Sequence, residues 1–184
     1  VWKTEIQPHY DTARKMLGVM RNPGLTPADK VCKEIAESLG YGDTFKSLPV
    51  GVFFGEENVK VADPYFNGEG PERTGCNFCG GCLVGCRFGA KNTLVKNYLF
   101  FAEKNGATII PEIKVTDIRP LTADHGQQGH PSIGKDARYA IVYQSSTSTI
   151  KREQTVFARN VILAAGTIGT LELLFHCRDE KKSL

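Results

Sequence analysis

Residues 158–174 read ARNVILAAGTIGTLELL, and this stretch decides the fold class of the chain. Residues 161–165 are all apolar, as in a strand that is buried on both faces of a parallel sheet. Gly166 follows at once, and Thr167 or Gly169 opens a helix with an apolar face formed by Leu171, Leu174 and Phe175. Ligands of such sheets bind outside the carboxyl ends of the strands, so a turn of small residues leaves room for one. Many such turns serve packing alone, and the spacing leaves both interpretations open.

Three helices are predicted upstream of this stretch. Residues 9–19 carry apolar side chains at helical spacing, and Pro8 suits a first helical turn. Thr26, Pro27 and Asp29 form a capping-box pattern that opens a second helix, which Gly40 ends. The pattern over 92–104 predicts the third helix.

Short β-rich segments surround these helices. They are predicted at 50–54, 108–110, 115–121, 139–144 and 154–158, and 122–136 is predicted to be a variable exposed loop. Residues 56–73 are rich in Gly, Pro and Asn and predict a long irregular excursion. The chain is therefore predicted to be an α/β protein of mixed α+β character.

Four cysteines follow the irregular excursion. Cys76, Cys79, Cys82 and Cys86 have the C-x₂-C-x₂-C-x₃-C spacing of ferredoxin ligands, which suggests a [4Fe-4S] cluster and an electron-transfer or metal-binding module. Arg87 stands where ferredoxins have proline, and no second cysteine set is present. A zinc site, disulfides and a metal-free thiol-rich turn remain open. Cys32 and Cys177 are expected to act as small apolar residues.

The composition excludes several classes of function. A net charge of +3 without a basic stripe argues against nucleic-acid binding. No apolar run approaches the roughly 20 residues of a membrane-spanning helix. The chain begins with Val1 and shows no signal peptide, and a cytoplasmic location is favoured. Both ends have the character of cuts within a longer protein.

Three segments, in this order, resemble the glucose-methanol-choline (GMC) family of FAD-dependent oxidoreductases, and within it the cholesterol oxidase branch. They are residues 8–19 (PHYDTARKMLGV), 88–99 (FGAKNTLVKNYL) and 158–174. The resemblance extends over nearly the whole chain and identifies it as an internal piece of such an enzyme. It implies that the full-length protein oxidises an alcohol, such as a sterol, by hydride transfer to FAD. Oxygen or another electron acceptor would then reoxidise the flavin.

The resemblance also implies where the cofactor lies. Val115 matches the residue whose backbone holds the adenine of FAD, and Ala164, Ala165 and Gly166 match the turn beside the dinucleotide. Residues 1–90 would supply substrate-side helices and the cysteine-containing segment. Residues 91–184 would supply part of the Rossmann-like FAD-binding domain, including a three-stranded meander over 113–158. A strand at 161–165 that leads directly into a helix is the structural feature on which this assignment depends.

Two parts of the family pattern are missing from the sequence. The G-x-G-x-x-G turn that seats the pyrophosphate is absent, and the catalytic histidine of the family would lie beyond Leu184. His9, His125, His130 and His176 match no catalytic position. The sequence therefore names no catalytic residue, and the piece alone is expected to be inactive.

Overall fold

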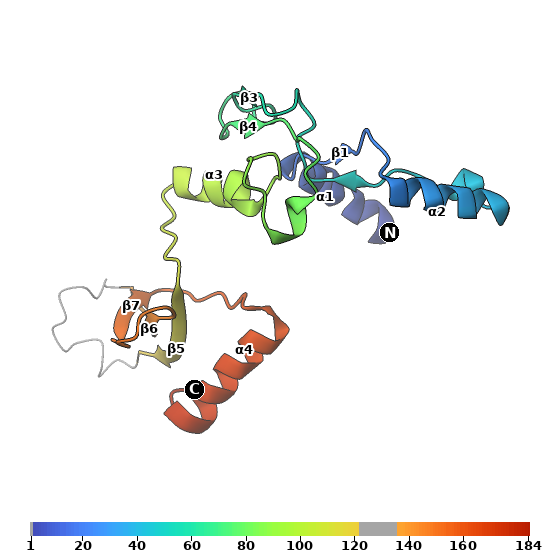
Figure 1. Cartoon of the computed structure of the whole chain (residues 1–184). Coiled ribbons are helices and arrows are strands. Elements are labelled where there is room, and N and C mark those ends of the chain that lie inside the picture. The colour runs from blue at the N-terminus through green and yellow to red at the C-terminus, as the bar shows by residue number, and fades with distance from the viewer. Residues whose placement is uncertain (1, 122–135) are drawn as a thin grey trace. The chain divides into compact units, whose positions relative to one another are not determined.

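The computed structural model describes residues 2–121 and 136–184, which form two compact units, Val1–Thr108 and Ile109–Leu184. Each unit mixes helices with small antiparallel sheets, in agreement with the predicted mixed character (Figure 1). The predicted loop at 122–136 lies outside the described residues except for Asp136.

The first unit contains three α-helices and two short β-ladders. The α-helices are α1 (Trp2–Met16), α2 (Pro27–Ser38) and α3 (Tyr98–Lys104). Strand β1 (Met20–Arg21) pairs with β2 (Pro49–Val50), and β3 (Lys60–Val61) pairs with β4 (Arg73–Thr74). Single 3₁₀ turns lie at Gly42–Thr44, Gly81–Val84 and Leu94–Lys96.

The helix predictions hold best where a specific capping pattern marks the helix start. The capping box before α2 is present, with Thr26 N–H donating to Asp29 Oδ2 at 2.8 Å. The predicted start of α1 is wrong, since the helix begins at Trp2 and Pro8 lies inside it. The predicted helix at 92–104 is interrupted at Asn97, whose φ and ψ of −142° and −96° are not helical.

A close approach between two backbone segments stabilises the irregular part of the first unit. Gly75 forms a bridge with Glu57, and an added Cβ at Gly75 would lie 1.9 Å from the carbonyl oxygen of Glu56. Val52 likewise bridges to Lys91. The predicted strand at 50–54 is therefore reduced to β2 and this isolated bridge, and only a glycine fits at position 75.

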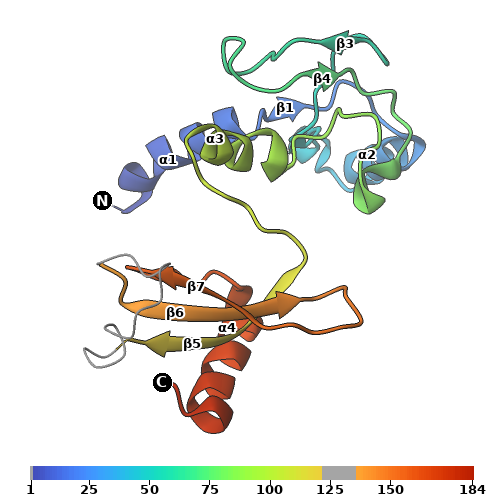
Figure 2. The ribbon, with the colours of Figure 1, turned by 90° about the vertical axis from the view of Figure 1, so that its left-hand side faces the viewer.

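The second unit is a three-stranded antiparallel meander with a helical arm, seen most clearly in Figure 2. Its strands are β5 (Ile113–Pro120), β6 (Tyr139–Ser145) and β7 (Gln154–Ala158), in that order, which confirms the predicted meander. Helix α4 (Gly166–Phe175) continues into a π-helical turn at His176–Lys181. The predicted β-segment at 108–110 is wrong, because these residues adopt no regular structure.

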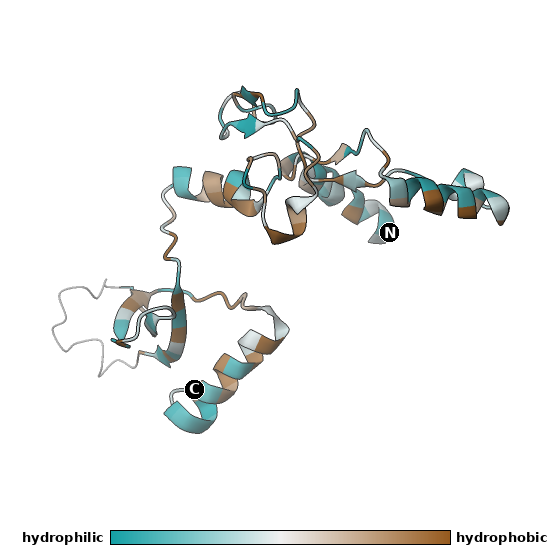
Figure 3. Ribbon diagram, in the orientation of Figure 1, coloured by the Kyte–Doolittle hydropathy of each residue, from teal (hydrophilic) through white to brown (hydrophobic). Residues whose placement is uncertain are grey.

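The predicted strand at 161–165 is also wrong, although a helix does follow it and begins at Gly166, one residue before the predicted Thr167. A strand needs a hydrogen-bonded neighbour, and no strand in the described residues pairs with this segment. The apolar surface that a sheet would cover is left open, since Ile162 is 90% exposed and Ile168 is 82% exposed. Figure 3 shows the hydrophobic colouring of this segment and of parts of α4. The sequence supplies the apolar character of a buried strand, but the described part of the chain supplies no sheet for it.

Candidate cofactor-binding cavity

The second unit contains a cavity with a volume of about 1100 Å³. Its walls come from β5, the segment 161–165, α4 and the π-helical turn. Three of the four predicted cofactor-binding residues, Val115, Ala164 and Ala165, line it. The fourth, Gly166, lines an adjoining hollow of about 520 Å³ that shares Leu163 and Ala164 with the cavity. The structure thus brings together residues that lie about 50 positions apart in the sequence.

The cavity combines an apolar interior with a charged rim. Apolar side chains from three segments line it, including Ile118, Ile141 and Leu173. At the rim, Lys114 Nζ lies 4.0 Å from Glu172 Oε1, and Lys181 Nζ lies 4.0 Å from Glu153 Oε1. These pairs are largely exposed and contribute little stability. Apolar walls with polar groups at the edge are typical of cofactor sites.

The turn between residues 161–165 and α4 is built from small residues. Gly166 has a φ of +74°, a conformation that favours glycine. Gly169, one turn into α4, also lines the cavity, and an added Cβ there would lie 3.4 Å from the Cβ of Ala165. Larger residues at this turn would therefore narrow the cavity.

A β-bulge lies in the wall of the cavity next to Val115. Val115 pairs with Tyr143 and Asp117 pairs with Val142, so Thr116 is an extra residue on β5. Asp117 is 1% exposed, and its carboxylate accepts hydrogen bonds from Ile118 N–H, Ser183 Oγ–H and Arg119 Nε–H. Burial raises the pKa of Asp117, but the contacts with Ser183, Arg119 and Cys177 outweigh burial and lower it. Sequence reasoning missed Asp117, although an aspartate inside a strand is unusual enough to signal a specific role.

The four clustered cysteines are free thiols in the first unit. Cys79 and Cys82 are exposed, and Cys76 and Cys86 are half-buried. Nowhere in 2–121 or 136–184 do three or more His, Cys, Asp or Glu side chains gather as a metal site would require. The iron–sulfur interpretation of the spacing is therefore not supported, and the zinc and disulfide alternatives gain no support either. Left-handed glycines at positions 80 and 85 bend the backbone between these cysteines.

Cys86 has a distinct local environment. Burial raises its pKa, but backbone N–H groups of Lys91, Phe88, Ala90 and Gly89 outweigh burial and lower it. Lys96 Nζ donates to the carbonyl oxygen of Gly89 at 2.7 Å, so its positive charge is fixed beside the same turn.

A buried polar network joins distant parts of the first unit, and sequence reasoning missed it. Arg73 is 1% exposed and donates to Asn92 Oδ1 at 2.6 Å and to the carbonyl oxygen of Lys96 at 2.8 Å. Asn92 Nδ2 donates to the carbonyl oxygen of Gly18 at 3.2 Å, and the guanidinium carbon of Arg73 lies 5.6 Å from the centre of the Tyr65 ring. Nothing in the spacing of these residues marks them in advance.

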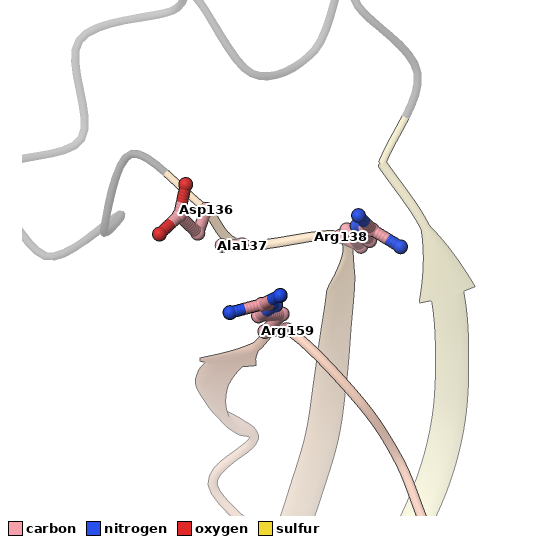
Figure 4. A pocket seen from close by; sticks show the side chains of 4 residues that line it. All are labelled: Asp136, Ala137, Arg138 and Arg159. Carbon is pink, nitrogen blue, oxygen red and sulfur yellow. The ribbon is translucent and has the colours of Figure 1, made fainter.

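A smaller hollow of about 310 Å³ lies at one end of the meander, where Asp136, Ala137, Arg138 and Arg159 line it (Figure 4). Arg138 precedes β6 and Arg159 follows β7, and Arg138 N–H donates to the carbonyl oxygen of Ala158 at 2.9 Å. In Figure 4 the two guanidinium groups point apart, so they do not converge on one ligand. In the described residues, no helix has the length and apolarity to span a membrane.

Comparison with known proteins identifies the class to which this fold and cavity belong. The family model for GMC oxidoreductases matches residues 71–177, which include β5, β6, β7, α4 and most of the cavity lining. The chain belongs to the GMC oxidoreductase family, which confirms the resemblance seen in the sequence. Family membership thus holds although the strand at 161–165 is not formed in this structure.

Curated relatives narrow the comparison. The chain is 45% identical over 184 residues to a cholesterol oxidase of Mycobacterium tuberculosis strain H37Rv, and this match covers 97% of the chain and 30% of the relative. It is 46% identical over 182 residues to a cholesterol oxidase of Acinetobacter baumannii, covering 97% of the chain and 32% of the relative. The chain therefore spans about a third of the length of these relatives. No solved structure matches it significantly.

Proposed function

We propose that the full-length protein is an FAD-dependent oxidoreductase that oxidises the hydroxyl group of a sterol-like alcohol. The observation that carries this proposal is the 45% identity to cholesterol oxidases over 97% of the chain. The cavity supports it, because Val115, Ala164 and Ala165 line one space in the region that the family model matches. Bound FAD would accept a hydride from the alcohol carbon, and an electron acceptor such as oxygen would reoxidise it.

The residues present in the chain fit one end of such a cofactor. The apolar walls suit the faces of an adenine ring, and the small residues at the turn let a dinucleotide approach the backbone. In this proposal the main chain at Val115 binds the adenine, and the turn at Ala164, Ala165 and Gly166 lies beside the dinucleotide. The pyrophosphate-binding turn and the base that takes the hydroxyl proton would come from the rest of the protein. A cytoplasmic location remains a prediction.

Flavin content and substrate turnover test the proposal directly. The full-length protein, purified without added cofactor, should carry the absorption bands of oxidised flavin and should convert cholesterol to a ketone. Turnover should fall when FAD is removed and return when FAD is restored. Parallel assays for hydrogen peroxide and for reduction of a dye would show which acceptor is used. A protein that binds no flavin, or that holds flavin and oxidises only short primary alcohols, would contradict the proposal in its first or second part.

A further inference from the structure

The cavity wall contains an irregularity that a regular strand would not have. Thr116 is the extra residue of the bulge in β5, and both Val115 and Thr116 line the cavity. In a regular strand, consecutive residues face opposite sides of the sheet. A bulge leaves the extra residue unpaired in the ladder and re-aims the backbone around it, and bulges are common beside functional sites.

Asp117 lies directly after the bulge but does not line the cavity. Its Oδ1 accepts the Ile118 N–H at 2.9 Å, and the same oxygen accepts the hydroxyl of Ser183. Its Oδ2 pairs with Arg119, and Ser183 N–H also donates to the carbonyl oxygen of Cys177 at 3.0 Å. Cys177 is fully buried. One carboxylate therefore ties the bulged part of β5 to the residues that follow α4.

We propose that Asp117 is a positioning residue for the cofactor, whose carboxylate holds the β5 bulge so that the main chain at Val115 and Thr116 faces the cavity. This inference rests on the proposed function, because it concerns the same FAD site. An unbonded carboxylate so deeply buried would be costly, which makes a specific set of partners necessary. A valine or isoleucine at position 117 would fit the apolar pattern of the strand, but it would leave the bulge without the hydrogen bonds that Asp117 accepts.

Three variants of the full-length holoenzyme separate the parts of this arrangement. Asp117→Ala removes every contact, and the dissociation constant for FAD should rise roughly tenfold. Asp117→Asn keeps an oxygen acceptor for Ile118 and Ser183, and the increase should stay within about threefold. Ser183→Ala removes one hydroxyl and should give an intermediate result. Asp136→Ala replaces an exposed carboxylate of the same unit and serves as the matched control, with no change expected.

Flavin release on dilution gives the dissociation constant, and two further readouts distinguish positioning from general loss of structure. The absorption spectrum of bound flavin should match that of the wild type in every variant, since the flavin ring lies away from the adenine end, and any loss of kcat in Asp117→Ala should be recovered by Asp117→Asn. Unchanged FAD affinity in Asp117→Ala would overturn the inference, as would a loss of kcat and an altered flavin spectrum that Asp117→Asn does not rescue. If Asp117→Ala does not fold, the dissociation constants for FAD of Ser183→Ala and Asp117→Asn are compared with the changes expected above, and they decide whether the inference holds. A wild-type protein that binds no FAD would overturn the proposed function and this inference together, whereas normal FAD binding with no effect of the variants would overturn only the inference.

Discussion

Arg73 Nε donates a hydrogen bond to Asn92 Oδ1 at 2.6 Å, and both side chains are buried. Asn92 Nδ2 in turn donates a hydrogen bond to the carbonyl oxygen of Gly18. The segments around residues 18, 73 and 92 therefore meet in one hydrogen-bond network. Gly18 has a φ of +53°, and an added Cβ there would lie 2.5 Å from Asn92 Nδ2. A first unit with few buried apolar side chains thus depends on polar contacts for its internal order.

Arg73→Ala is therefore expected to destabilise the full-length protein by about 3 kcal/mol, because it leaves the Asn92 and Lys96 oxygens buried without their donor. Arg73→Lys should recover little, since one ammonium group cannot replace the guanidinium fork. Chemical denaturation gives the free energy of unfolding. Arg87→Ala, an exposed arginine of the same unit, should change it by less than about 0.5 kcal/mol. Equal losses at both positions would count against the network.

Gly75→Ala is expected to cost about 3 kcal/mol or more, because the new Cβ would lie 1.9 Å from the Glu56 carbonyl oxygen and one backbone would have to move. Gly81→Ala provides the matched control, since the nearest atom to its added Cβ, apart from the two adjacent residues, is Cys79 Sγ at 3.6 Å. The melting temperature of Gly75→Ala should be clearly lower than that of Gly81→Ala. Similar melting temperatures would show that the two segments are not in contact.

Asp63 gives the first unit a pH-dependent contribution to stability. Its carboxylate accepts backbone N–H groups from Tyr65, Phe66, Gly68 and Gly70 at 2.8–3.1 Å. Burial raises the pKa of Asp63, but these four hydrogen bonds outweigh burial and lower it below the ordinary aspartate value of 3.8.

Because the folded pKa lies below the unfolded one, this stabilisation is fully present above pH 3.8 and disappears as the pH falls through the folded pKa. Asp63→Asn should therefore lower stability at neutral pH, by about 1–2 kcal/mol, and flatten the acid side of the profile. Denaturation measured between neutral and acid pH checks this. A parallel loss at every pH would mean that the charge of Asp63 is unimportant.

Ala165→Phe tests the location of the cofactor cavity. A phenyl ring at this position would occupy space in the cavity that Ala165 lines, and the FAD content of the purified protein should drop at least about tenfold. Ala137→Phe, in the small hollow at the other end of the meander, should retain FAD. Folding of both variants can be followed by circular dichroism. Full FAD retention by Ala165→Phe would place the cofactor elsewhere.

The sequence predicted those elements whose signals are local. The capping box at Thr26 and Asp29 and the β-rich segments at 115–121, 139–144 and 154–158 depend on neighbouring residues, and the structure contains both. The segment 161–165 was predicted wrongly as a strand. Its apolar pattern is typical of a strand buried in a sheet, and the described residues contain no sheet that pairs with it. Asn97 interrupts a helix for a non-local reason, since Arg73 takes the Lys96 carbonyl beside it.

The candidate site likewise contains some residues that the sequence could indicate and others that depend on contacts between distant residues. Val115 and the Ala164–Gly166 turn were predicted through resemblance as cofactor-binding residues, and they line one cavity and its adjoining hollow. Asp117 was missed because its partners, Ser183 and Cys177, lie some 60 residues away and no spacing rule joins them. The cysteine spacing gains no support as a metal site, since in the described residues its thiols do not gather into a group that could hold a metal ion.

In the proposed function, the full-length protein would be a flavoenzyme that takes a hydride from a sterol alcohol. Anaerobic mixing of the purified full-length protein with cholesterol tests it most directly. The account predicts that the blue absorption band of oxidised flavin bleaches in a single turnover, with one ketone formed per flavin reduced. Persistence of the oxidised band with excess cholesterol, in a protein whose flavin dithionite readily reduces, would contradict it.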